Sequence, residues 1–162
     1  MKFNLATAGC NVELEVLSRR YAAAMDRRDR TALLSVFDAD ASMRVERPGR
    51  EAGTLRGPDE IGRLMEIIAR WPRTLHILGQ GLYQLDARSA YGEVYCTAHH
   101  FDLLDKNAGR DHIMYILYVD RYRLDRDDRW RINHRTVLVE ATEDRPVQVG
   151  NWAADEKSHA LS

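Results

Sequence analysis

The chain has 162 residues, 44% of them hydrophobic, which is typical of one domain with a buried core. Its 24 basic and 25 acidic residues nearly cancel, so we expect neither nucleic acid nor an anionic membrane as a partner. No apolar run approaches the roughly 18 residues that a membrane span needs. Cys10 and Cys96 lie far apart, which argues against a disulfide framework and favours a cytoplasmic protein. The expected partner is a small-molecule substrate.

The N-terminal half carries the signals of three helices. The first is expected from an N-cap at Asn11 to about Asp26, because apolar residues recur there every three or four positions. Asp29 is expected to cap a second, short helix, which the segment 38–42 ends. After a short strand pair, a third helix is expected over 59–70, because proline and acidic residues suit its first turn. The apolar stripe of the first helix consists of Leu14, Leu17, Tyr21 and Met25.

The second half has the alternation of β-strands. From Arg73 onward the hydrophobic period changes from about 3.6 to 2, and short turns between the apolar runs predict antiparallel pairing. Helices followed by such strands are typical of the α+β class, with the helices packed on one face of a strongly curved antiparallel sheet. We expect a single domain over 1–162, with its core at 11–142 and an extended or partly disordered tail at 143–162. The strands are expected over residues 73–86, 89–104, 110–125 and 129–142.

Asp26 and His76 are the candidate catalytic pair. Asp26 comes late in the first helix and His76 lies in an apolar strand, so both side chains are expected at one cavity. A carboxylate bonded to one imidazole nitrogen fixes the tautomer and raises the basicity of the other nitrogen, which can then take a proton. The pair therefore predicts general acid/base chemistry. The alternative is that Asp26 pairs with an arginine within residues 27–30 and His76 is an ordinary buried histidine.

The alternation of side chains along a strand predicts which face of the sheet each of the other polar residues lies on. His100 shares an apolar face with Ala98, so we expect His100 rather than His99 at the cavity. Both faces of the strand at 110–125 are apolar, and parity does not choose between them. Arg135 is interpreted as a surface or interface charge. The first long strand is expected to present one face through His76, Leu78, Gln80 and Leu82.

The sequence predicts no metal and no cofactor. The adjacent residues His99 and His100 point to opposite faces of a strand, and the spacings HxH, HExxH and CxxC are absent. A metal site built from Asp26, His76 and His100 stays open as an alternative. Neither a nucleotide-binding glycine loop nor a GxSxG elbow is present.

Several segments carry a family resemblance. They read RYAAAMDRRDRTALLSVFDADA, GPDEI, RTLHILGQG, YCTAHH and DRYRLDRDDRWRINHR. Together with the order of elements, they resemble the SnoaL-like branch of the nuclear-transport-factor-2-like superfamily over about residues 11–142. The resemblance implies a cone-shaped, half-open barrel, in which a curved antiparallel sheet and three helices enclose an apolar pocket. Members of the superfamily are commonly dimers or trimers, so we also expect a homo-oligomer.

The resemblance also implies a reaction class. Asp26 matches the carboxylate and His76 the histidine of a dyad that dehydratase-like members use as orienting acid and general base. We therefore predict a cofactor-independent lyase that performs a dehydratase-type elimination on a cyclic, largely apolar molecule, such as a polyketide, steroid or aromatic intermediate. One alternative is a polyketide cyclase or isomerase with the same dyad. The other is a non-catalytic ligand-binding module or a dioxygenase small-subunit-like protein.

Three further residues are expected to bind substrate by this resemblance. Tyr21 and His100 match a tyrosine and a second histidine of dehydratase members, and Tyr118 lies near an asparagine position of scytalone dehydratase. Met25 and Arg47 stand where scytalone dehydratase has pocket tyrosines. This departure means that the resemblance does not carry over the substrate.

Overall fold

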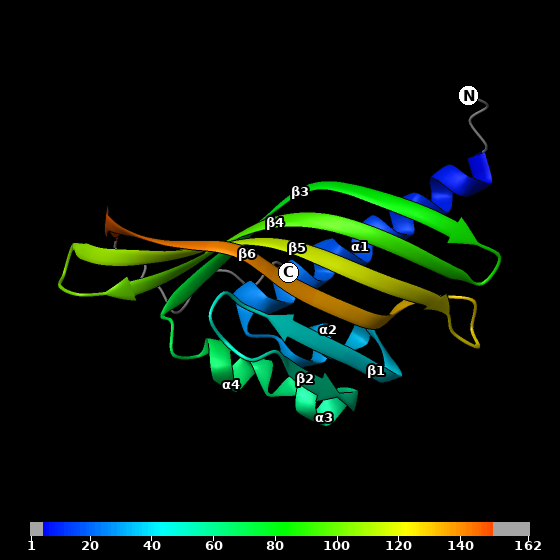
Figure 1. Ribbon diagram of the computed structural model, residues 1–162, viewed down its shortest axis with the longest axis horizontal. Helices are drawn as coiled ribbons and strands as arrows, with labels where there is room; N and C mark the ends of the chain where they lie inside the picture. Colours follow the sequence, from blue (N-terminus) through cyan, green and yellow to red (C-terminus); the bar gives the residue numbers. More distant parts are fainter. Residues whose placement is uncertain (1–4, 151–162) are drawn as a thin grey trace, which may run out of the picture.

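A long helix and a curved, unclosed sheet dominate the structure, a computed structural model that describes residues 5–150 (Figure 1). The α+β class predicted from the sequence is confirmed. The helices are α1 (Leu5–Arg27), α2 (Arg30–Ser35), α3 (Gly57–Gly62) and α4 (Leu64–Ile68). The strands are β1 (Phe37–Glu46), β2 (Gly53–Arg56), β3 (Arg73–Asp86), β4 (Ser89–Leu103), β5 (Ala108–Leu124) and β6 (Trp130–Gln148).

The apolar stripe of α1 packs on the inner face of the sheet, as its spacing predicts. The helix begins at Leu5, so Asn11 lies inside it and the predicted N-cap is wrong. Three of residues 5–10 are leucine or alanine, which favour a helix, so the helix starts before the polar residue that resembles a cap. The cap of α2 is confirmed, because Asp29 Oδ1 accepts a hydrogen bond of 2.8 Å from the Ala32 amide.

Two helix boundaries differ from the expectation. α2 ends at Ser35, and the segment 38–42 lies within β1 rather than in a helix-ending loop. Phe37 and Ala41 are buried in β1, so burial and sheet pairing outweigh the turn preference of the aspartates between them. The third predicted helix is divided at Arg63 into α3 and α4.

The sheet has the order β2-β1-β6-β5-β4-β3. β3 to β6 pair antiparallel through short connections, as expected, whereas β1 pairs with β6 in parallel. The residues that join β1 to β6 include most of the chain, so hairpin rules do not apply to that pair. β6 continues to Gln148 along β5, so residues 143–148 of the expected tail form a strand. Residues 151–162 lie outside the described part of the chain.

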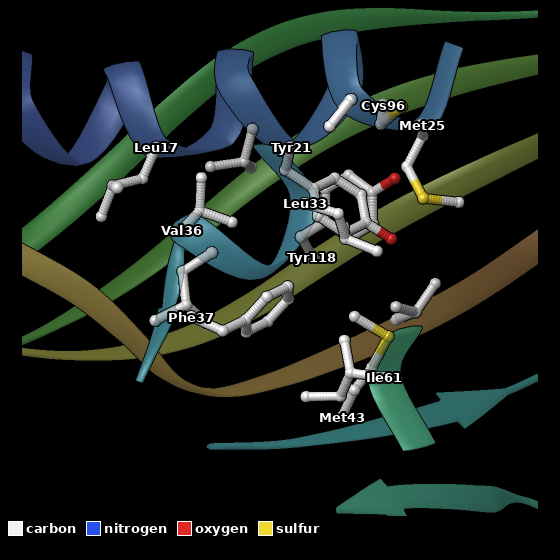
Figure 2. Close-up of a cluster of buried hydrophobic side chains, with 14 of the residues drawn as sticks. Leu17, Tyr21, Met25, Leu33, Val36, Phe37, Met43, Ile61, Cys96 and Tyr118 are labelled. Atoms are coloured by element: carbon white, nitrogen blue, oxygen red, sulfur yellow. The ribbon is translucent and has the colours of Figure 1, made fainter. Parts of the chain in front are cut away.

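The core lies between α1, α2 and the inner face of the sheet, where Tyr21, Leu33, Phe37 and Tyr118 meet (Figure 2). Each buried side chain of this size contributes about 1.5–3 kcal/mol. The predicted inward face of β4 is correct, with Val94, Cys96, Ala98 and His100 all buried. A bulge between Leu78 and Gly81 reverses the parity of β3, so Leu82 is 65% exposed and its predicted facing is wrong.

None of the helices within residues 5–150 is long and apolar enough to span a membrane.

Candidate active site

α1, α4, the end of β1 and the inner face of the sheet enclose a hollow of about 70 Å³. Most of its wall is apolar, and the sulfur-containing side chains Met25, Met43 and Met114 take part in it. Methionine side chains adapt their shape readily, so the hollow can widen around a ring-sized ligand. The polar and aromatic residues of the wall are Tyr21, Arg47, Arg70, Trp71, His76, His100 and Tyr118.

His76 lines this wall, whereas Asp26, which was also expected at the cavity, is not among its lining residues and is hydrogen-bonded to the His76 ring. His76 Nδ1 lies 2.7 Å from Asp26 Oδ1, and the His76 backbone amide donates to Asp26 Oδ2 at 2.9 Å. The His76 side chain is 5% exposed and the Asp26 side chain 22%. With Nδ1 facing the carboxylate, the neutral ring carries its proton there, and Nε2 on the opposite side of the ring keeps its lone pair.

The position of β3 at the sheet edge explains why a helix residue reaches this strand. An edge strand has backbone amides that no neighbouring strand pairs, and Asp26 in the last turn of α1 accepts one of them. Thr74, also in β3, donates its hydroxyl to Asp26 Oδ1 at 3.0 Å. The carboxylate is therefore held by both the backbone and the side chains of β3.

Arg28 links the same elements from behind the dyad. Its guanidinium donates to Thr74 Oγ1 at 2.7 Å and to the carbonyls of Met25 and Trp71 at 2.6 and 3.0 Å. Its backbone has φ +60°, the left-handed conformation that commonly ends a helix. The alternative of an Asp26–arginine pair is not what the structure shows, because Asp26 bonds to His76 and Thr74.

The environment keeps the Asp26 carboxyl ionised. Burial alone acts to raise its pKa, but the hydrogen bonds from His76 and Thr74 and the charge interaction with His76 outweigh burial. The resulting pKa lies below the ordinary value of an aspartate. An ionised Asp26 stabilises an imidazolium on His76, which is what a general base requires after it has taken a proton.

His100 also lines the hollow, and it is neutral. Its Nδ1 lies 3.1 Å from the His112 carbonyl, which can only accept, so Nδ1 carries the proton and Nε2 is an acceptor. Burial, with repulsion from His76 and His112, lowers the pKa of His100 to about 4. As predicted, His100 rather than His99 is at the cavity, since His99 bonds to Asp111 instead.

Tyr21 and Tyr118 lie side by side in the wall, with their ring centroids 5.6 Å apart and their hydroxyls on the same side (Figure 2). Burial raises the pKa of Tyr21 to about 12 and that of Tyr118 well above its usual value. Both hydroxyls therefore remain protonated and able to donate hydrogen bonds to a ligand.

A buried arginine stands behind these tyrosines. The Arg135 guanidinium lies 4.2 Å from the Tyr21 ring centroid and 4.3 Å from that of Tyr118. It donates to both oxygens of Asp120, at 2.8 and 2.6 Å, and both side chains are fully buried. Tyr122 donates its hydroxyl to the same carboxylate at 2.7 Å. The ion pair therefore fixes the two tyrosine rings of the wall.

The interpretation of Arg135 as a surface charge is wrong. Its parity in β6 is that of Val137 and Val139, which line the hollow. The sequence did carry a signal: Asp120 has the parity of Tyr118 and Tyr122 on an apolar strand face. A carboxylate on a buried face needs a cation from a neighbouring strand.

The metal site that the sequence left open can be compared with the positions of the polar side chains. Among residues 5–150, no group of three or more His, Cys, Asp or Glu side chains is placed to hold a metal ion. The sequence left open a metal site built from Asp26, His76 and His100. In the structure, Asp26 and His76 are hydrogen-bonded to each other. The expectation that no cofactor is needed stays a prediction.

Comparisons with known proteins agree with this fold. The hexachlorocyclohexane dehydrochlorinase LinA-type3 of Novosphingobium barchaimii is 18% identical with a TM-score of 0.71, over 91% of this chain and 94% of that one. A putative scytalone dehydratase of Novosphingobium aromaticivorans is 19% identical with a TM-score of 0.70, over 90% and 93%. A protein of unknown function with a cystatin-like fold from Nostoc punctiforme is 18% identical with a TM-score of 0.66, over 86% and 96%.

At these identities the structural likeness establishes the fold alone. No curated protein matches the sequence. The sequence model of the SnoaL-like domain matches residues 12–136, a range that includes most of α1, Asp26 and His76, and the strands β1 to β5. The chain belongs to the SnoaL-like domain family.

Proposed function

We propose that this protein is a cofactor-independent lyase that eliminates water from a cyclic, largely apolar molecule through the Asp26–His76 dyad. The observation that carries the proposal is the 2.7 Å bond between His76 Nδ1 and Asp26 at the wall of an apolar hollow. Similarity to a dehydrochlorinase and to a putative scytalone dehydratase supports the same class of reaction. A hollow of about 70 Å³ is smaller than the cavity of roughly 150 Å³ that holds benzene, so its methionine side chains must move to admit a single ring.

In the proposed step, His76 Nε2 takes a proton from the carbon next to a carbonyl. The electron pair of that C–H bond forms the new carbon–carbon double bond while the C–O bond to the leaving hydroxyl breaks. The imidazolium, stabilised by ionised Asp26, then returns its proton to the departing oxygen, and water leaves. Proton transfer of this kind contributes about 10²–10⁴-fold, and positioning in the hollow supplies further acceleration.

The other polar groups have separate tasks in this proposal. The Tyr21 hydroxyl, with its pKa raised to about 12, donates a hydrogen bond to a substrate oxygen without losing its proton. Tyr118 lies beside it, and its hydroxyl, which also interacts with the Cys96 thiol, is a second polar group at this position. His100 accepts a hydrogen bond from a substrate hydroxyl through Nε2, and because it is neutral it binds the leaving group rather than protonating it.

The test uses 3-hydroxycyclohexanone, whose dehydration to 2-cyclohexenone is followed by ultraviolet absorbance. Wild-type protein should accelerate the loss of water. His76→Ala and Asp26→Asn should each lower the rate by about 10²–10⁴-fold, the first by removing the base and the second by favouring the wrong tautomer. Asp29→Asn is the matched control, because asparagine is an equally good N-cap and this position lies outside the hollow.

Exchange of the α-protons of the same ketone in D2O, followed by NMR, separates proton removal from water loss. Exchange without elimination would indicate an isomerase or cyclase with the same dyad. Variants at position 76 or 26 that match the wild-type rate of both processes would refute the proposal.

A further inference from the structure

Arg47 carries a buried polar atom that no group within residues 5–150 satisfies. It follows β1 and lines the hollow, and its Nε has no hydrogen-bond partner within residues 5–150. By contrast, Arg19 and Arg135 donate to the carboxylates of Glu15 and Asp120, although Nη1 of Arg135 is also buried without a partner among the described residues. A buried guanidinium nitrogen without an acceptor costs free energy, unless a ligand supplies the acceptor.

A second arginine stands at the same part of the wall. Arg70 follows α4 and lies with its guanidinium 5.2 Å from the Trp71 ring centroid, and both residues line the hollow. Burial, together with repulsion from Arg50 and Arg70, lowers the pKa of Arg47. The charges that act on Arg47 are thus of its own sign, and they favour a bound anion.

The rest of the wall contains no acidic side chain to neutralise this pair. Asp26 belongs to the dyad but is not itself among the described residues that line the hollow, and it bonds to His76 and Thr74. His100 is neutral, with its pKa lowered to about 4. The hollow therefore combines an apolar space with a net positive charge on one side.

We propose that Arg47 binds a carboxylate on the substrate, with Arg70 adding attraction at the same position, so that the substrate is a cyclic acid rather than a neutral ring. The guanidinium fork matches a carboxylate, which would satisfy the open Nε. The inference rests on the proposed function in that it takes the hollow as the substrate site. It adds that the carboxylate anchors the ring while the dyad acts on another carbon.

The test measures binding rather than turnover, by isothermal titration calorimetry at neutral pH. The probes are benzoate with benzamide and 2-naphthoate with 2-naphthamide, which differ in charge but hardly in shape. Wild-type protein should bind at least one acid about tenfold or more tightly than its amide, which corresponds to one charge-assisted hydrogen bond. The preference should weaken as ionic strength rises, because Arg70 is exposed.

Variants identify the group responsible. Arg47→Gln should remove the preference for the acid, Arg47→Lys should keep part of it, and Arg70→Gln should reduce it. Arg63→Gln is the matched control, because Arg63 is an exposed arginine that does not line the hollow and is not among the charges that act on Arg47. Its preference should equal that of the wild type. Melting temperatures without ligand check the fold, and exposed Arg70 provides the second variant if position 47 does not tolerate change.

Equal binding of acid and amide in both pairs, including no binding of either, overturns the inference, as does an unchanged preference in folded Arg47→Gln. Since none of the four probes has a hydroxyl leaving group, the result does not depend on catalysis. His76→Ala should keep the preference for the acid even though it loses elimination. Failure of the dyad proposal and failure of the carboxylate site are therefore distinguishable.

Discussion

His76 and His99 make aspartate hydrogen bonds of the same length in very different surroundings. Each Nδ1 lies 2.7 Å from a carboxylate, that of Asp26 for His76 and that of Asp111 for His99. His99 stacks on Phe101 and does not line the hollow, whereas His76 does. An Asp–His bond is thus not sufficient to define a site. Whether such a histidine can act as a base depends on what its other ring nitrogen faces, because a base acts only on a group that it can reach.

The buried neutral state of His100 should make stability depend on pH. Its pKa is about 4 when folded, against about 6.5 for an unperturbed histidine. Between these values the unfolded chain binds the proton and the folded chain does not. Stability is therefore fully present above about pH 6.5 and is lost as the pH falls toward about 4. Urea unfolding at about pH 7 and pH 5 should show a loss of about 2 kcal/mol from this group.

The control for this prediction is His100→Gln, which keeps a donor for the His112 carbonyl but does not titrate. The wild type should lose about 2 kcal/mol more than the variant over the same interval. Identical pH dependence in the two proteins would mean that His100 is not held neutral. The carboxyl of Asp26 does not interfere, because its lowered pKa places its effect below about pH 4.

At the scale of elements, the end of α1 is joined to β3 by polar contacts rather than by apolar packing alone. Asp26 accepts from the edge of β3, and Arg28 reaches Thr74 and the Trp71 carbonyl. Arg28 keeps a left-handed backbone that glycine would adopt without strain. Its side-chain hydrogen bonds explain why an arginine stands there.

This arrangement predicts different costs for two substitutions of Arg28. Arg28→Ala loses the side-chain bonds and keeps the backbone strain, so it should lower the free energy of unfolding by about 2–4 kcal/mol. Arg28→Gly loses the same bonds but relieves the strain, so it should cost about 1 kcal/mol less. Chemical denaturation measures both. An alanine variant at least as stable as the glycine variant would show that φ +60° is not strained here.

At the scale of the whole molecule, the sheet leaves an apolar outer face. Leu75, Ile77, Tyr95 and Tyr115 lie on the side opposite the hollow and are between 37% and 50% exposed. In the register of β3, β4 and β5, Ile77 is paired with Thr97, and Thr97 with Tyr115, so these side chains form neighbouring rows. Such a face is typical of an interface between protein surfaces.

We therefore propose that the outer face joins copies of this chain, in line with the homo-oligomer expected from the sequence. Light scattering of the wild type should give the mass of a dimer or trimer, and Ile77→Glu should shift it toward the monomer, because a buried charge without a partner is costly. Val12→Glu is the matched control, since Val12 is exposed on α1, away from this face. A monomeric wild type would contradict the proposal.

The sequence by itself determined most of the elements and indicated the candidate pair Asp26 and His76. Hydrophobic periodicity depends on local geometry, so α1, the bounds of β3 to β5 and the inward face of β4 could be predicted. The local contexts of Asp26 and His76, together with the family resemblance, made them the candidate pair; the structure shows that they are hydrogen-bonded, and their catalytic role stays a proposal.

The tertiary structure alone decided which side chains share a space. The parallel pairing of β1 with β6 and the bulge after Leu78 depend on contacts between distant segments, which no local pattern encodes. The same holds for Arg135, whose burial requires Asp120 on the neighbouring strand, and for Arg47 beside Arg70. A sequence does not distinguish a buried charged residue from an exposed one. Only packing determines which charged side chains are desolvated and therefore need a partner of opposite charge.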